Sequence, residues 1–487
     1  MKWGMVRRVF RLATAVACAS VSVSALAQAP APVPAPPVRA PTPAPQQLPP
    51  AAGEPMAIDF SADPVLRLRR QQTGDLFFRT LIAAAVERHP GTLESAALED
   101  EAVGALEEAR SGRLPTIDLS ITSYRVISRD FSDDPFNIVE RSRPRQRTDA
   151  LVNVSQTIFD FGATTQRVLA AGARLRSASA DIETAADRVA LGAIAAWYDL
   201  FAFRSLVALT EAFLNSQRDL RASVQIRIRE GVSAEGDLAR VDSYIAQGET
   251  RIARFRRQLA SAEARFTELT GTPPPPDLGR APVPPLAAAT RDDAAFAAAD
   301  AAAVRSAAAI ADSSRREARA ARADRLPILS AGIDAGRYGA IENDRDYDIR
   351  GRVALRYRIF GPADARAEQA EARARAASAR ADRTREEAER DAAIAWSDVR
   401  ALEQQLEALE ASYIASRRSR DVIVERFRVA RGTLFDVVAA EDSYFESATA
   451  YIQALAELDA ARWVLLSRMG RLLDALDIDG ERLRGEG

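Results

Sequence analysis

The sequence predicts a mainly α-helical protein with a membrane β-barrel portion, built from two copies of one long-helix hairpin unit. Three observations predict this fold class: very long stretches without proline, an internal duplication, and short segments in which apolar and charged residues alternate. The stretch from Ala163 to Arg229 could form one helix of about 100 Å at 1.5 Å per residue. Helices in globular proteins average about 11–12 residues, so a helix this long belongs in a coiled coil or a helical barrel.

The N-terminus has the three parts of a secretory signal. Basic residues come first, an apolar run over 12–23 follows, and an A-x-A cleavage pattern ends at Ala27. The run is too short to span a membrane. The alternatives are a buried helix and lipoprotein processing at Cys18. We expect residues 1–27 to be a removed signal peptide, and residues 28–74, rich in Pro and Ala, to be disordered or polyproline-like.

The chain repeats itself, because five landmarks recur in the same order about 200 residues further on. One match could be chance, but five in order indicate a duplication. The spacing shrinks between the Leu-Pro and Phe-Gly landmarks, so the first repeat carries about thirteen extra residues there. The recurring pairs are Arg113-Leu114-Pro115 with Arg325-Leu326-Pro327, Phe161-Gly162 with Phe360-Gly361, Trp197 with Trp396, Gly231 with Gly432, and Asp242-Ser243-Tyr244 with Asp442-Ser443-Tyr444.

Each repeat has the same order of elements. A helical stretch, Asp75 to Ser111 or Arg291 to Asp324, ends at Leu-Pro because the residue before a proline avoids the helical conformation. A strand, a loop and a strand follow, and after Phe-Gly come two long helices separated by a Gly-containing break. We therefore expect a first repeat over 75–272, a Pro-rich linker over 273–290, a second repeat over 291–476 and a disordered tail over 477–487.

Apolar residues in the long helices follow a heptad pattern of alternating steps of three and four. Charged runs such as Glu386 to Arg390 are typical of solvated helix faces rather than of binding patches. The heptad residues are Leu206, Leu209 and Phe213 in the first repeat, and Val399, Leu402, Leu406, Leu409 and Tyr413, then Tyr451, Leu455, Leu458, Leu465, Met469 and Leu472, in the second, where Arg462 fills the missing step between Leu458 and Leu465.

The segment from Tyr347 to Phe360 alternates between apolar residues and charged residues, mostly arginines. Successive side chains of a strand point to opposite faces, so one face would be apolar and the other charged. Weaker alternation at Ile117 to Ile121 and around Val152 and Val154 predicts further strands, and two hairpins make four strands per chain. Three chains would supply twelve strands for a closed barrel with a charged lumen and a lipid-facing apolar side. A small soluble sheet packed on the helices is the alternative.

Composition argues against several classes of function. The net charge of −2 gives no reason to expect nucleic acid as a partner. One cysteine, Cys18, and one histidine, His89, cannot form a zinc site or a Cys–His nucleophile pair. The sequence shows no phosphate-binding Gly-rich loop and no nucleophile elbow, so we expect no enzyme activity, no cofactor and no metal.

The duplicated pattern resembles the TolC family of outer-membrane efflux and type I secretion proteins. The resemblance covers nearly all of Asp75 to Leu476, and its best motif runs from Arg426 to Tyr444, with a counterpart at Arg229 to Leu238. It implies a homotrimer with an α-barrel tunnel in the periplasm and a twelve-stranded β-barrel in outer membrane lipid. It also implies a passive channel that works with a periplasmic membrane-fusion adaptor protein and an inner-membrane ABC or proton-driven transporter.

The resemblance places a closable periplasmic aperture at the breaks near Gly231 and Gly432. Asp436 matches one position of an acidic ring in the family, whereas Ala439 stands at the usual second position. The segment from Thr433 to Asp436 also fits a capping box, and an acidic residue suits a helix N-terminus, so Asp436 has two roles open to it.

Asp237 matches a first-repeat residue that helps to hold the aperture closed, and it has the same capping alternative. Its usual aromatic hydroxyl partner is replaced by Phe427, which cannot donate a hydrogen bond. The closing contact must therefore differ, and Arg431 is the substitute we consider. The arginine-rich strand face gives the candidates for the barrel lumen, which are Arg350, Arg352, Arg356 and Arg358.

Two functions are open from the sequence. One is the outer-membrane channel of an export system, for type I protein secretion or for efflux of drugs and small molecules. The other is a soluble periplasmic coiled-coil adaptor or scaffold. Two lipid-facing hairpins favour the channel, because an adaptor has no use for them. The sequence names neither the cargo nor the cognate transporter.

Overall fold

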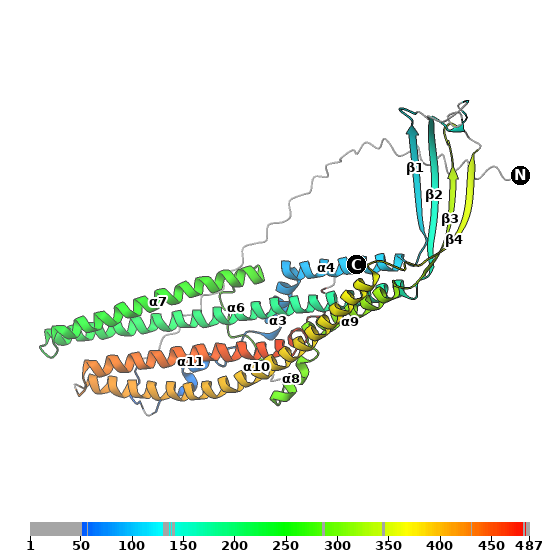
Figure 1. Ribbon diagram of the computed structural model, residues 1–487. Helices are drawn as coiled ribbons and strands as arrows, with labels where there is room; N and C mark the ends of the chain where they lie inside the picture. Colours follow the sequence, from blue (N-terminus) through cyan, green and yellow to red (C-terminus); the bar gives the residue numbers. More distant parts are fainter. Residues whose placement is uncertain are drawn as a thin grey trace. The chain divides into compact units, whose positions relative to one another are not determined.

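The computed structural model describes residues 51–55, 57–129, 136, 138, 142–284, 288–342, 346–429, 431–480 and 483. The expected signal peptide, with Cys18, lies outside these residues. Within them the chain is mainly helical with a four-stranded antiparallel sheet, as predicted (Figure 1). The helices are η1 (Phe60–Ala62), α2 (Pro64–Arg67), α3 (Asp75–Arg88), α4 (Pro90–Ser111), α6 (Ala163–Arg229), α7 (Glu235–Thr270), α8 (Arg291–Ala298), α9 (Ala302–Ala323), α10 (Ala363–Arg428), α11 (Leu434–Arg468) and α12 (Leu472–Ala475).

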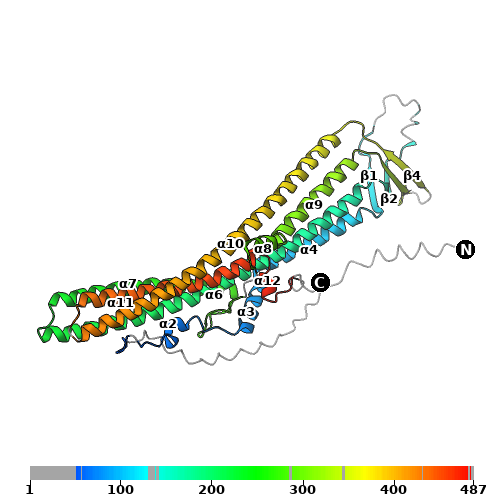
Figure 2. The ribbon, with the colours of Figure 1, turned by 90° about the horizontal axis from the view of Figure 1, so that it is seen from below.

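Two very long helices, α6 with 67 residues and α10 with 66, carry the two repeats. α6 has the bounds that the absence of proline predicted. α7 folds back along α6, α11 folds back along α10, and α11 also packs against α6 (Figures 1 and 2). The turn after α6 contains Gly231 at φ +76°, a left-handed conformation that glycine adopts without a Cβ clash. The duplicated unit is therefore a helical hairpin.

The two shorter helical stretches are each broken once, which the sequence analysis did not predict. His89 is extended (φ −68°, ψ 131°) because Pro90 disfavours a helical residue before it, so α3 ends and α4 begins there. Nδ1 of His89 accepts a hydrogen bond from the amide of Gly91 (3.0 Å) and caps α4. α8 and α9 are bent by 42° at residues 299–301, and Gly470 packs closely there, since a Cβ on it would lie 3.0 Å from the Cα of Ala301.

The main core lies where α3, α6 and α11 meet. Trp197 is fully buried, and its ring packs edge-on against Phe78 with 5.2 Å between the ring centroids. Trp463 adds a third ring, 5.6 Å from Phe78. Part of α6 is long and apolar enough to cross a membrane, but 61% of that stretch is buried inside the protein. It is therefore the core helix of the helical part.

The sheet joins the two repeats, since β2 of the first pairs with β3 of the second. Alternate residues share a face, so the antiparallel register makes one continuous apolar face. Its large side chains are exposed, with Leu119 at 70% and Ile349 at 67%. The strands, in spatial order, are β1 (Thr116–Arg125), β2 (Gln146–Phe159), β3 (Ile328–Arg337) and β4 (Tyr347–Arg356), and two apolar rows across them are Ile117, Val154, Ile333, Gly351 and Leu119, Val152, Ala335, Ile349.

The strand predicted from Tyr347 to Phe360 ends earlier, at Arg356. Arg356 pairs with Ile328, the first residue of β3. The next residue of β4 would face Pro327, which has no N–H to donate to the ladder. Arg358, one of the lumen candidates, therefore lies beyond the sheet.

Residues 51–55 and 57–74, called here the N-terminal strap, are packed, which differs from the disorder expected for 28–74. Val65 and Leu68 enter the main core, and the buried Asp63 caps α2 by accepting from the amide of Val65 (2.8 Å). These apolar side chains supply the burial that the Pro- and Ala-rich part lacks. Part of the expected disordered tail is packed as well, through Ile478 and Leu483.

Candidate functional site

The tips of the two hairpins share a small apolar cluster that is separate from the main core. Val224 and Val241 come from the α6/α7 hairpin. The α10/α11 hairpin supplies Phe427, Leu434, Val437 and Val438. The breaks near Gly231 and Gly432, where the aperture is predicted, are thus brought together within one chain.

Arg227, near the end of α6, makes a polar contact between the tips. Its guanidinium lies 4.2 Å from the centroid of the Phe427 ring, and its Nη1 donates to the carbonyl oxygen of Phe427 (3.2 Å). The sequence predicted that Phe427 cannot donate a hydrogen bond to Asp237 and that the closing contact must differ, with Arg431 as the substitute considered. Arg227 could have been found from the duplication, because Arg227 and Phe427 stand at similar distances before the glycine of each break.

The other aperture candidates lie at the tips. Asp436 accepts from the Thr433 hydroxyl (2.7 Å), and its amide donates to that hydroxyl (3.2 Å), so the capping box is present. Asp237 caps α7 by accepting from the amide of Ala234 (3.2 Å). Arg431 is exposed, and its side chain has no ion-pair partner in the described part of the chain. The aperture roles of these residues stay predictions.

The repeated Asp-Ser-Tyr motif has two different uses. Asp242 pairs with Arg221 inside the first hairpin (2.5 Å), and this hydrogen-bonded pairing lowers the pKa of Asp242. Asp442 instead pairs with Arg251 of the other hairpin (2.7 Å). The aspartate of the motif therefore makes an ion pair across the seam only in the second repeat.

The second face of the sheet carries charges of both signs. Arg350 pairs with Asp348, and a nitrogen of Arg352 lies 3.9 Å from an oxygen of Asp334. Both arginine side chains are more than half exposed. The predicted arginine face is thus partly neutralised by aspartates on β3 and β4.

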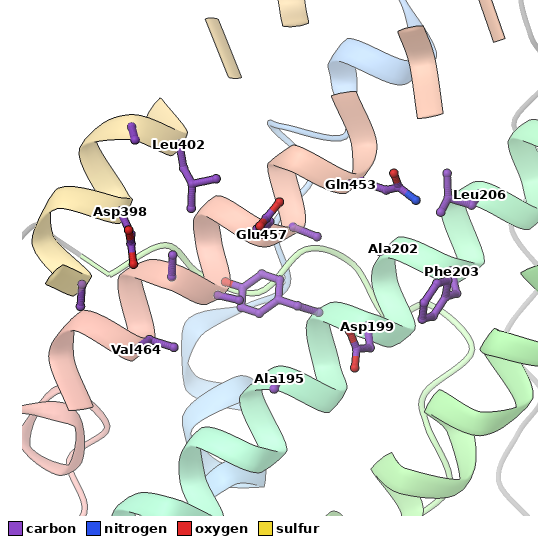
Figure 3. A pocket seen from close by; sticks show the side chains of 16 residues that line it. Ala195, Asp199, Ala202, Phe203, Leu206, Asp398, Leu402, Gln453, Glu457 and Val464 are labelled. Atoms are coloured by element: carbon purple, nitrogen blue, oxygen red, sulfur yellow. The ribbon is translucent and has the colours of Figure 1, made fainter. Parts of the chain in front are cut away.

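A groove of about 690 Å³ lies where α6, α10 and α11 meet (Figure 3). Alanines and a few larger apolar side chains make its walls, and neither lysine nor arginine lines it. The carboxylates of Asp199, Asp398 and Glu457 reach it from three different helices (Figure 3). Burial raises the pKa of Asp199, because a half-buried carboxylate loses hydration. The groove is therefore apolar with acidic side chains around it.

The other side of α11 is buried under the linker between the repeats. Glu457 and Asp459 are two residues apart, which places them about 200° apart around the helix. Asp459 is completely buried and forms a two-point ion pair with Arg280 of the linker (2.5 and 2.7 Å). One side of α11 therefore faces the groove at Glu457, and the opposite side is covered by the linker at Asp459.

Glu441 is a buried carboxylate nearer the tips. An oxygen of Glu441 lies 3.5 Å from Arg420, while its Oε2 has no hydrogen-bond partner in the described residues. Burial raises the pKa of Glu441. It lines a second groove of about 850 Å³, together with Arg227 and Phe427. Over the described ranges, no group of three or more His, Cys, Asp or Glu is placed to hold a metal ion.

Comparisons with known proteins match both the sequence and the fold. The family model of outer membrane efflux proteins matches residues 81–272, which is most of the first repeat. The outer membrane efflux protein BepC of Brucella suis biovar 1 (strain 1330) is 21% identical over 413 residues, which cover 81% of this chain and 91% of BepC.

Three solved structures show the same chain fold. The outer membrane protein VceC of Vibrio cholerae has a TM-score of 0.71 at 18% identity, covering 81% of this chain and 96% of VceC. The CmeC outer membrane channel of Campylobacter jejuni has 0.71 at 14%, covering 86% and 92%. The open-state MtrE outer membrane channel of Neisseria gonorrhoeae has 0.67 at 18%, covering 81% and 89%. The resemblance seen in the sequence is confirmed.

Proposed function

We propose that this chain is a member of the outer membrane efflux protein family, whose model its first repeat matches, and that three copies of it form a passive export channel through the outer membrane and the periplasm. The observation that carries the proposal is a sheet with one exposed apolar face, joined to two long helical hairpins. The outer-membrane location and the channel function are those predicted from the sequence. A soluble adaptor is not favoured, because a soluble protein would cover such an apolar face.

The dimensions of the sheet support a place in lipid. β1, β3 and β4 each have 10 residues. A transmembrane β-strand needs about 9–11 residues. We assign the face that carries Leu119 and Ile349 to lipid.

Assembly would close the sheet. β1 and β4 are edge strands that each pair with one neighbour in the chain. An unpaired strand edge is not tolerated in the hydrocarbon of a bilayer. Pairing β4 of one copy with β1 of the next closes a twelve-stranded antiparallel barrel from three copies.

The polar face then lines the water-filled lumen, with Arg350, Arg352 and Arg356 among its side chains. In the helical part, we assign the groove that contains Glu457 to the lumen side. The support for this assignment is that the linker covers the other side of α11 at Asp459.

The proposed partners follow from the fact that a passive channel has no energy source of its own. A channel without an energy source needs a periplasmic membrane-fusion adaptor protein and an inner-membrane ABC or proton-driven transporter. Type I protein secretion and small-molecule efflux use the same conduit. A neighbouring gene for an ABC transporter beside a large repetitive secreted protein would indicate secretion, whereas a proton-driven pump would indicate efflux.

Membrane fractionation and native mass spectrometry test the proposal. We expect three copies per particle in the outer-membrane fraction; amine crosslinkers are unsuitable because Lys2 is the only lysine. Leu119→Arg should reduce insertion, since an arginine on the lipid face costs about 2–4 kcal/mol at the bilayer midplane. The neighbouring Ser120→Arg, on the lumen face, is the matched control. A monomer in the soluble periplasmic fraction would contradict the proposal.

A further inference from the structure

The N-terminal strap is tied to one face of α10. The amide of Ala52 donates to Asp421 (3.3 Å), and Arg69 pairs with Glu410 (2.9 Å). Between these ends, Asp63 contacts two further side chains of α10. The four α10 positions, 410, 413, 417 and 421, follow steps of three and four, so they lie on one helix face. The strap therefore runs along α10 for about three turns.

Asp63 is the centre of this contact, and its side chain is completely buried. Both of its oxygens lie 2.9 Å from the hydroxyl of Tyr413, and its Oδ2 pairs with Arg417. Oδ1 also accepts the amide hydrogens of Val65 and Leu66 (2.8 and 3.1 Å). Breaking such a buried pair leaves an uncompensated charge, so the contact resists opening.

The other end of the strap is tied to the first repeat through the linker. The amide of Thr73 donates to the carbonyl of Arg280 (2.8 Å), and the amide of Gly279 donates to the Thr73 hydroxyl (3.1 Å). The linker is fixed to α6, because Nε1 of Trp197 donates to the carbonyl of Gly279 (2.9 Å). Strap and linker together bridge α6 of the first hairpin and α10 of the second.

We propose that the N-terminal strap is a latch across the seam between the two hairpins, fastened by Asp63, and that its release lets the tip of α10/α11 move away from α6. The tips themselves are joined by their small apolar cluster and by the contacts of Arg227 and Arg251. The latch acts further from the tips and across the same seam. The claim that this movement opens a channel rests on the proposed function; the movement itself does not.

The test measures the distance between the two hairpin tips by pulsed electron paramagnetic resonance on the full-length purified protein. Spin labels are placed on Ile226→Cys and Val429→Cys, whose native side chains are 47% and 57% exposed, with Cys18→Ser. Asp63→Asn keeps the shape of the side chain and removes its charge. Asp59→Asn is the matched control, because Asp59 is an exposed capping carboxylate of the same strap. We expect a longer or broader distance only for Asp63→Asn.

A second variant and a second readout separate the outcomes. Tyr413→Phe removes one donor to Asp63 and keeps the ring, so it should give a smaller change in the same direction, even where Asp63→Asn fails to assemble. Unchanged distances in the variants that assemble would overturn the latch. Single-channel conductance should rise together with the distance. A longer distance without higher conductance would support the latch proposal and count against the proposed channel function.

Discussion

The guanidinium of Arg227 lies over the ring of Phe427, where the ends of α6 and α10 meet. The two residues come from corresponding places in the two repeats, so one contact couples both long helices. The same guanidinium also donates to the backbone of Phe427. The contact is therefore the first place to test whether the tips hold each other.

Arg227→Gln should loosen the tips. A cation over an aromatic ring contributes about 0.5–2 kcal/mol. At 1.4 kcal/mol per tenfold change, its loss should raise the open probability of single channels by roughly 2- to 30-fold. Phe427→Leu should have the same effect, whereas Phe427→Tyr keeps a ring and should behave like the wild type. Equal open probabilities for Arg227→Gln and wild type would rule out a closing role.

Asp436 can be tested for two roles separately. Asp436→Asn keeps a capping acceptor and removes the charge, so an aperture role predicts weaker cation block of single-channel current with the helix start intact. Asp436→Ala should weaken the block and also remove the reciprocal bond of the capping box and a favourable charge in the first turn of α11, which costs about 0.3–1 kcal/mol of stability. If block is unchanged in both variants, Asp436 is a capping residue alone.

Replacing Arg350 and Arg352 with Ser should shift ion selectivity towards cations. The double variant removes two positive charges per chain from the face assigned to the lumen and leaves Asp348 and Asp334 without these partners. Reversal potentials in a salt gradient measure the shift. Val353→Ser, on the lipid face and next to Arg352 in sequence, is the control and should leave selectivity as it is. No shift in the double variant would mean that these arginines do not face the lumen.

Removing one partner of the buried Arg280–Asp459 pair should lower the free energy of unfolding, whereas replacing both partners with apolar residues should not. Arg280→Met leaves a buried carboxylate and should lower the free energy of unfolding by about 3–5 kcal/mol. Arg280→Met with Asp459→Leu should recover most of that loss, because apolar replacement of a buried pair is often neutral. Arg221→Met breaks an exposed pair and should change the free energy of unfolding little. Urea unfolding of the purified protein measures these changes. A double variant as unstable as Arg280→Met would contradict the prediction that apolar replacement restores stability.

Glu441 should make stability depend on pH. Its pKa is raised in the folded chain above the unfolded value of about 4.3. The stabilising contribution of its bound proton is therefore fully present below that value and is lost as the pH rises through the raised pKa. As the pH rises from the unfolded pKa through the raised folded pKa, Glu441→Gln should lose less stability than the wild type. Glu457→Gln, at an exposed position, is the control; parallel stability curves for Glu441→Gln and wild type would disprove the effect.

Long, strongly periodic elements could be predicted from the sequence. α6 was predicted with its observed bounds because no proline interrupts it, and the alternation in β4 predicted the two faces of the sheet. The break at His89 was missed although the rule about the residue before proline applies there. The early end of β4 depends on its partner Pro327, which local alternation cannot reveal.

Contacts between distant parts of the chain could not be predicted. Asp63 is held by Tyr413, 350 positions away, and Arg280 by Asp459, 179 positions away. The composition of residues 28–74 predicts disorder because most of its first half is Pro and Ala, and it says nothing about a buried carboxylate. The contact of Phe427 with Arg227 depends on how the two hairpins pack.

The near-equal lengths of α6 and α10 restrict how a protein of this shape can evolve. One residue inserted into either helix rotates everything beyond it by about 100° and would turn its buried stripe towards water. Seven inserted residues restore the stripe and lengthen the helix by about 10 Å. The neighbouring hairpin must lengthen by the same amount for the tips of the two hairpins to remain side by side. The reach of the helical part can therefore change only in whole-heptad steps taken by both repeats together, while single insertions are confined to the loops.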